Sequence, residues 1–145
     1  MFAALHNLKV VNIPYLSKFY KNNSNFGDVK LANISPSDFL SLIKHSECVF
    51  TDSFHACVFS FIYSKNVFAF RRSKTDDLGV RLKDFMSLID AVDHYCDCEE
   101  KEQLSYIEAI SSNIVYKKNN DEIKELINYS MEYLKQNINQ AIKIL

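Results

Sequence analysis

The stretch CVFTDSFHACVFSFIYSKNVFAF, residues 48–70, decides the fold because it contains a strand, a helix and a second strand in direct succession. Residues 48–51 form a short, continuous apolar run, which is typical of a strand covered on both faces. Residues 53–63 predict a largely buried helix, and residues 66–70 predict a strand that ends before a pair of arginines. This succession predicts two parallel strands joined by a helix.

Outside this stretch, short strands and helices continue to alternate. A helix is expected to begin at residues 35–38, Ser-Pro-Ser-Asp, because serine caps helices, proline suits the first helical position and an acid suits the first turn. The other expected elements are a helix end at 1–7, strands at 8–13, 29–32 and 91–96, a loop at 22–28, and helices at 81–89, 103–110 and 120–145. The side chains expected to point inward from the helix at 81–89 are Leu82, Phe85, Met86 and Ile89.

The helix expected at 120–145 has an apolar stripe that is suited to docking on a core. Its members recur at three- and four-residue steps, and they are Ile123, Leu126, Ile127, Met131, Leu134, Ile138 and Ile142. A coiled coil is less favoured, because the apolar spacing does not hold a clean heptad with charged flanks.

The alternation of elements predicts an α/β fold. We expect a Rossmann-like parallel sheet with helices on both faces, formed by a single domain over residues 1–145. In such folds ligands bind beyond the carboxyl ends of the strands, where strand-to-helix turns expose backbone amides. That edge of the sheet is therefore the expected place for functional residues.

The composition describes an ordinary globular protein, with 145 residues of which 48% are hydrophobic and 24% are charged. A formal net charge of −1 excludes a globally basic nucleic-acid binder, so no nucleic-acid partner is expected. No segment approaches the roughly 20 apolar residues of a transmembrane helix. The first residues do not resemble an export signal, so we expect a cytoplasmic protein with its four cysteines reduced.

The turn at residues 51–55, Thr-Asp-Ser-Phe-His, joins the first strand of the central unit to its helix. A helix N-terminus presents unpaired amide groups and a partial positive charge, so it suits an anion. Asp52 or Ser53 is expected to cap this helix, and His55 to lie in its first turn. The helix dipole lowers the pKa of an imidazole there and a nearby carboxylate raises it, so His55 is a candidate acid–base group.

Basic residues follow the next strand of the unit. Arg71 and Arg72 end that strand, Lys74 follows, and Arg81 lies at the start of the next helix. In a parallel sheet these residues belong to the same edge as His55, and arginine binds phosphate and carboxylate bidentately. Each residue also has an ordinary interpretation as a cap, a packing residue or a solvated strand end. Their convergence on one edge is what favours an anion site.

No metal or organic cofactor is expected. His94, Cys96 and Cys98 share one face of an extended segment, but structural zinc sites favour two or more residues between paired cysteines and need a fourth ligand. With only Gly27 and Gly79 in the chain, Gly-rich dinucleotide and nucleoside-triphosphate loops are excluded. The acidic run that begins at residue 97 is interpreted as a solvated helix start.

A set of short segments occurs in a specific order along the chain. They are residues 36–43 (PSDFLSLI), 49–55 (VFTDSFH) and 58–60 (VFS), then Lys65, Arg81 near the start of the next helix, and residues 130–134 (SMEYL). In order and spacing they resemble the C-terminal half of the polysaccharide pyruvyl transferase family, over about residues 8–134. One departure is Ala56, where the family commonly has glycine, because alanine crowds a backbone that approaches a ligand closely.

The resemblance implies a fold and an activity. Family members have two Rossmann-like domains facing each other in a GT-B-like arrangement, so this chain is expected to be the C-terminal domain without the N-terminal one. They transfer a pyruvyl group from phosphoenolpyruvate to a sugar hydroxyl in exopolysaccharide or capsule biosynthesis. The resemblance further implies that phosphoenolpyruvate and a glycan or lipid-linked sugar acceptor are the substrates. A separate N-terminal half or a second copy of the chain are the candidate protein partners.

The resemblance also implies roles for the residues of the edge. His55 would be the general acid, and Asp52 would orient its imidazole or cap the helix. The expected substrate-binding residues are Ser53, Phe54, Arg71, Arg72 and Arg81, whose arginines would hold the donor's phosphate and carboxylate.

Two other functions stay open at this point. One is a non-catalytic remnant or partner-binding module, which an exposed apolar patch at the His55 edge would favour. The other is a sugar-nucleotide glycosyltransferase domain, since that chemistry also uses two facing Rossmann-like domains. Stabilisation by phosphoenolpyruvate and not by nucleotide sugars would separate the pyruvyl transferase from it.

Overall fold

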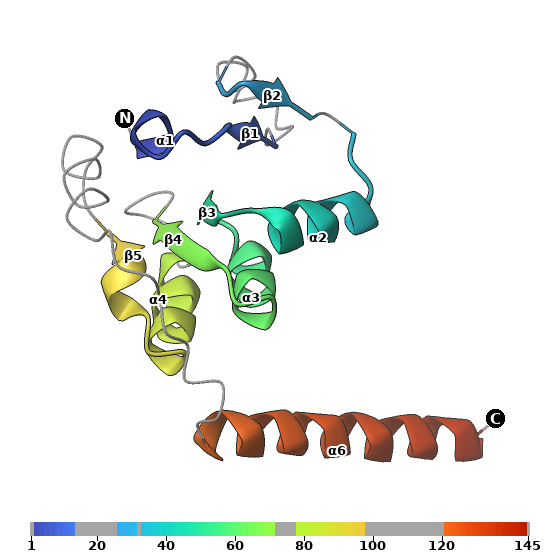
Figure 1. Cartoon of the computed structure of the whole chain (residues 1–145). Helices are drawn as coiled ribbons and strands as arrows, with labels where there is room; N and C mark the ends of the chain where they lie inside the picture. Colours follow the sequence, from blue (N-terminus) through green and yellow to red (C-terminus); the bar gives the residue numbers. More distant parts are fainter. Residues whose placement is uncertain (1, 14–25, 32, 72–77, 98–120, 145) are drawn as a thin grey trace.

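The computed structural model describes residues 2–13, 26–31, 33–71, 78–97 and 121–144 (Figure 1). Its elements are α1 (Phe2–Leu5), β1 (Val11–Asn12), β2 (Val29–Lys30), α2 (Pro36–His45), β3 (Cys48–Thr51), α3 (Phe54–Ile62), β4 (Asn66–Phe70), α4 (Leu78–Leu88), the 3₁₀ helix η2 (Val92–His94), β5 (Tyr95–Cys96) and α6 (Asp121–Ile144). The helix expected at 103–110 lies outside the described residues, as does Arg72.

The described strands pair in parallel throughout. β1 pairs with β2 in one sheet, and β3, β4 and β5 form a second sheet in that order. The registers place Thr51 opposite Ala69 and Ala69 opposite Tyr95, so the three strands of the second sheet end at the same edge. The predicted α/β class with parallel strands is confirmed.

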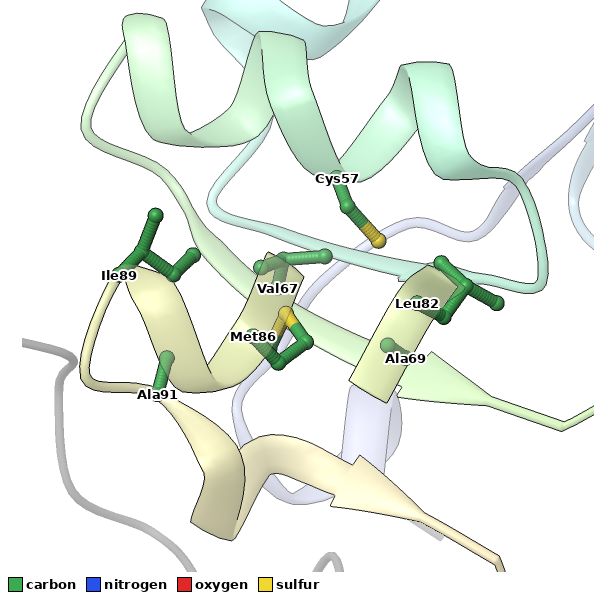
Figure 2. Close-up of a cluster of buried hydrophobic side chains, with 7 residues drawn as sticks. All are labelled: Cys57, Val67, Ala69, Leu82, Met86, Ile89 and Ala91. Atoms are coloured by element: carbon green, nitrogen blue, oxygen red, sulfur yellow. The ribbon is translucent and has the colours of Figure 1, made fainter. Parts of the chain in front are cut away.

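The helices α3 and α4 lie on the same face of the second sheet. Val67 and Ala69 of β4 point to that face, where they pack with Cys57 of α3 and with Leu82 and Met86 of α4 (Figure 2). Because the order β3–β4–β5 advances in one direction, right-handed crossovers put both connecting helices on one side. The core therefore forms between this face and the two helices.

The opposite face of the second sheet carries a row of aromatic rings. Phe50 of β3 stacks on Phe68 of β4 with 4.9 Å between ring centroids, and Phe70 lies 6.3 Å from Phe50. Phe50 is 43% exposed, so the prediction that its strand is covered on both faces is wrong for this residue within the described structure. The physical reason is the strand order, since helices reach the second face only where that order reverses.

The start of α2 matches its prediction in detail. Ser35 is the N-cap, its hydroxyl accepts a hydrogen bond from the Asp38 backbone N–H at 3.1 Å, and the Asp38 carboxylate accepts one from the Ser35 backbone N–H at 3.0 Å. The Ser35 hydroxyl also donates to the Asp38 carboxylate at 2.7 Å, and this bond, followed by the one from the Ser35 backbone N–H, lowers the pKa of Asp38 below its ordinary value. This capping box satisfies two donors locally, which explains why the local sequence predicts it well.

The segment after α4 differs from its prediction. In place of one strand at 91–96, the chain forms the 3₁₀ helix η2 and then the short strand β5. Asp90 takes the left-handed conformation with φ 59°, and the Ala91 N–H donates to the Met86 carbonyl at 2.8 Å. This is the hydrogen-bond pattern of a helix C-terminus that glycine usually forms. Because the residue at this position is aspartate and not glycine, the end of the helix is not recognisable from the sequence.

His94 of η2 is a buried histidine that packs against Phe68 of the second sheet. It is 5% exposed, and its ring stacks on Phe68 with 4.7 Å between centroids. Burial lowers the pKa of His94 below its ordinary value, while a hydrogen bond with the Val67 backbone and the charge of Asp93 act in the opposite direction. Within the described residues its Nδ1 atom has no hydrogen-bond partner. The folded protein therefore prefers the neutral imidazole.

This preference predicts a loss of stability in mild acid. The folded-state pKa of His94 lies below the ordinary value of 6.5, so the unfolded chain takes up the proton first as the pH falls. The neutral, buried His94 contributes fully to the free energy of unfolding above pH 6.5. This contribution is lost as the pH falls below 6.5, and the free energy of unfolding then changes by at most about 1.4 kcal/mol per pH unit. Urea unfolding at pH 7.5 and 5.5 measures it. His94→Gln should reduce the pH dependence of the free energy of unfolding, whereas His45→Gln, at an exposed site, should leave it as it is. Equal pH dependence in the two variants would contradict the prediction.

The prediction that the apolar stripe of α6 docks on the core is wrong for most of the helix. Ile123 is 6% exposed, but the other large apolar side chains described on α6 are between 46% and 72% exposed. Figure 1 shows the helix lying apart from the sheets. None of the described helices is both long enough and apolar enough to cross a membrane.

Candidate functional site

The turn between β3 and α3 lies at the carboxyl edge of the second sheet. Ser53 is the N-cap of α3, and its backbone N–H donates to the Thr51 hydroxyl oxygen at 3.0 Å. The Ser53 side chain makes no capping hydrogen bond, so the first-turn amides of α3 receive no acceptor from it. The predicted helix start is confirmed, with Ser53 in the capping position.

Asp52 is exposed and lies just before the helix. Its charge is felt by Cys57, one turn into α3: burial chiefly, and the Asp52 charge in addition, raise the pKa of the Cys57 thiol to about 12. Cys57 is thus a core residue that stays protonated and unreactive. The carboxylate of Asp52 contributes negative potential at the same helix end where the dipole contributes positive potential.

Phe54 connects the turn to helix α4. Its ring packs against Phe85 with centroids 5.5 Å apart, and the guanidinium carbon of Arg81 lies 4.8 Å from the centre of the Phe54 ring. The His55 ring meets the same phenylalanine edge-on, with centroids 6.0 Å apart. Both His55 and Arg81 are exposed to solvent. The structure therefore places the imidazole and the guanidinium against one aromatic ring.

Arg71 reaches the same edge from the end of β4, but it already has an acidic partner. One guanidinium nitrogen lies 3.2 Å from Oδ1 and 3.3 Å from Oδ2 of Asp97, directly after β5. The side chain also lies against α4, because a Cβ at Gly79 would come within 2.9 Å of the Arg71 Cγ. The pair is half-exposed, with side-chain exposures of 27% and 50%, so solvent weakens it.

The predicted residues thus fall into two groups at one edge. Phe54, His55 and Arg81 are in contact as a set, and Ser53 and Asp52 precede them in the same turn. Arg71 lies beside the first turn of α4, which also carries Arg81. Arg72 and Lys74 lie outside the described residues. The roles assigned to these residues remain predictions.

Asp97 and Gly79 are two residues of this edge that the sequence interpretation missed. Asp97 was grouped with a solvated acidic run, yet it pairs with Arg71. The available signal was its position directly after a short strand, because parallel strands end together. Gly79, at the beginning of α4, has no Cβ and therefore leaves room for the Arg71 side chain. This close approach is visible only in the structure.

The described residues contain no cluster of three or more histidine, cysteine or acidic side chains arranged to hold a metal ion. His94 and Cys96 are both buried, and His94 stacks on Phe68 instead of facing an open site. Cys98 lies outside the described residues.

Comparisons with known proteins bear on the family of the chain. The comparisons with curated proteins and with solved structures gave no match. A family model, described as polysaccharide pyruvyl transferase, matches residues 2–74, which is half of the chain. The match includes the α2 motif and the turn with His55, and it ends before Arg81 and before residues 130–134. By this match, the chain belongs to the polysaccharide pyruvyl transferase family.

Proposed function

We propose that this chain provides the donor side of a site that transfers a pyruvyl group from phosphoenolpyruvate to a sugar hydroxyl. The observation that carries the proposal is the contact of His55 and Arg81 with the ring of Phe54, at the carboxyl edge of a parallel sheet. An acid–base group and a permanent cation are thus held next to each other by one aromatic side chain. Family membership supports the reaction class.

The reaction needs a proton donor and anion binders, and this edge offers both. In the proposed mechanism His55 protonates the methylene carbon of the enol, which leaves an oxocarbenium-like centre at the neighbouring carbon. A sugar hydroxyl attacks that centre and loses its proton. Phosphate then leaves with its bonding electron pair, which forms an oxocarbenium-like centre again. A second hydroxyl of the sugar attacks this centre, loses its proton and closes the ketal. Asp52 orients the imidazole or shapes the potential at the helix start.

Arg81 and the first turn of α3 are proposed to bind the donor's charged groups. Arg81 is exposed and lies over Phe54, so its guanidinium can form bidentate contacts with phosphate or carboxylate. Arg71 is assigned a supporting role, in which its bond to Asp97 exchanges for one to the substrate. Ser53 and Phe54 line the approach. In this proposal the chain is the C-terminal-type domain, and the acceptor sugar enters from a facing N-terminal half.

Ligand-induced stabilisation tests the donor. Phosphoenolpyruvate at about 100 times its Kd should stabilise the protein by about 2.7 kcal/mol, seen as a rise in the melting temperature. A nucleotide sugar at equal concentration should give no rise, and inorganic phosphate a smaller one. Arg81→Gln should remove most of the rise, and Lys83→Gln, at an exposed position of the same helix, should keep it. A rise with the nucleotide sugar alone would favour the glycosyltransferase.

A partner-binding module is the second candidate, and Phe50 is the observation that favours it. This ring is 43% exposed on a strand that ends at the His55 turn. It belongs to the row of aromatic rings that it forms with Phe68 and Phe70, and contiguous apolar surface is typical of protein interfaces. If no phosphorylated ligand changes the melting temperature, while a separate N-terminal family half binds the chain and loses affinity with Phe50→Ser, this second function is the better one.

A further inference from the structure

The ion pair of Arg71 and Asp97 continues the register of β4 and β5 beyond the ends of both strands. Ala69 lies opposite Tyr95 in this register, and the two charged residues follow two positions later along their strands. Because side chains alternate between the faces of a strand, the pair lies on the face that carries α4. The Arg71 backbone N–H donates to the Cys96 carbonyl at 3.1 Å, so the backbone beside Asp97 is held next to Arg71.

Helix α4 contacts the Arg71 side chain from above the sheet. A Cβ on Gly79 would lie 2.9 Å from the Arg71 Cγ, 3.1 Å from its Nε and 3.2 Å from its Cδ. The arginine thus packs against the backbone of the first turn of α4, and the same turn contains Arg81. One helical turn therefore positions both arginines that the structure describes at this edge.

The pair with Asp97 shows which kind of anion the Arg71 guanidinium accepts. One of its nitrogens lies 3.2 Å from one carboxylate oxygen and 3.3 Å from the other, so this position already binds a carboxylate. Both side chains are partly exposed to solvent, and an ion pair in contact with solvent contributes little free energy. A ligand carboxylate can therefore take the place of Asp97 at a small cost.

Asp97 also makes this position unequal for the two charged groups of phosphoenolpyruvate. Its backbone is held by the strand pairing, so its negative charge stays near Arg71 after its side chain has been displaced. The two charges of the pair then largely cancel for an incoming anion. A phosphate ester, with a charge of about −1.5 to −2 at pH 7, gains little there from its higher charge. Arg81, in contrast, lies against the uncharged ring of Phe54 and is the better partner for phosphate.

We propose that Arg71 binds the carboxylate of phosphoenolpyruvate in place of Asp97, while Arg81 binds the phosphate. This inference rests on the proposed function and adds which arginine takes which charged group. Asp97 is then a specificity-determining residue, because it competes with the donor for Arg71 and disfavours phosphate at that position. Gly79 is a positioning residue, since its missing side chain leaves room for Arg71 against α4.

Two ligands that differ by the carboxylate test the assignment on the full chain. Methyl phosphate has a phosphate ester without a carboxylate, and it is compared with phosphoenolpyruvate at constant ionic strength, because salt screens exposed charges. Melting temperatures over a ligand titration give each Kd. The double variant Arg71→Gln/Asp97→Asn removes both charges and keeps the net charge. It should raise the Kd for phosphoenolpyruvate about tenfold and change that for methyl phosphate by less than about twofold.

Asp97→Asn alone tests the competition for Arg71. This variant should lower the Kd for phosphoenolpyruvate by about two- to fivefold, which corresponds to the strength of an exposed ion pair. Glu47→Gln is the matched control, since it makes the same change in net charge at an exposed residue before β3, at the other end of the strand. It should leave the Kd unchanged.

Gly79→Ala is a second variant for the carboxylate assignment. Its new Cβ would displace the Arg71 side chain, so it should weaken the binding of phosphoenolpyruvate and leave that of methyl phosphate unchanged. Far-ultraviolet circular dichroism checks the folding of each variant, and Gly79→Ala replaces the double variant if that one does not fold.

The results that overturn this inference differ from those that overturn the proposed function. Equal losses for both ligands in the double variant would contradict the carboxylate assignment, and no loss for either ligand would remove Arg71 from the site. Asp97→Asn without tighter binding of phosphoenolpyruvate would contradict the competition. In these cases the unchanged protein still binds phosphoenolpyruvate, and the proposed function stands. If the unchanged protein binds neither ligand, the proposed function fails and this inference fails with it.

Discussion

Replacing His55 with glutamine is expected to slow pyruvyl transfer by about 100- to 10,000-fold, the range that a general acid contributes. Glutamine keeps the size and hydrogen-bonding capacity of the side chain, but it cannot deliver a proton. The site is exposed, so the free energy of unfolding should change by no more than about 0.5 kcal/mol. The measurement is phosphate release and pyruvate incorporation from phosphoenolpyruvate, with an N-terminal family half supplied.

The matched control for this variant is His45→Gln. His45 is also an exposed histidine, in the last turn of α2, where its Nδ1 lies 2.8 Å from the Ser41 carbonyl oxygen. This variant should transfer pyruvate at the normal rate. A His55→Gln enzyme that retains more than half of the normal rate would remove the general-acid role, and the ligand-induced rise in melting temperature would then show whether donor binding survives.

Truncating Leu82 to alanine is expected to have the largest effect on stability, about 2–5 kcal/mol. Leu82 is 2% exposed and lies in the cluster between α3, α4 and β4 (Figure 2). Its removal leaves a cavity next to Cys57, Val67 and Met86, which form the same cluster and cannot close over it without strain. Because domains are stable by only about 5–15 kcal/mol, this loss is a large part of the total.

Leu88→Ala provides the control from the same helix. Leu88→Ala removes the same atoms as Leu82→Ala from the same helix, with the same change in helix propensity. Because Leu88 is 37% exposed, its truncation leaves no comparable cavity in the core. Urea unfolding at neutral pH should show a midpoint for Leu88→Ala close to that of the unchanged protein, and a much lower one for Leu82→Ala. Similar losses in the two variants would mean that the cluster in Figure 2 does not carry the stability of the domain.

Local sequence predicted the central unit almost residue by residue. β3 and β4 have the bounds expected from the apolar runs at 48–51 and 66–70, and α3 (Phe54–Ile62) lies within the helix predicted at 53–63. The start of α2 was equally predictable, since the bonds of its capping box join residues three apart. These features depend on neighbouring residues, so no distant contact can easily change them.

The sequence by itself therefore determined the order of strands and helices in the central unit, their parallel pairing and the edge at which the candidate site residues lie. Only the tertiary structure decided which of those residues meet: Arg81 lies over Phe54, while Arg71 is drawn to Asp97 across the ends of β4 and β5. It also decided that His94 is buried and that α6 leaves its stripe bare, where the sequence pattern predicted docking on the core. The physical reason is that periodicity specifies which face of an element is apolar, whereas the partner of that face depends on contacts between residues far apart in the chain.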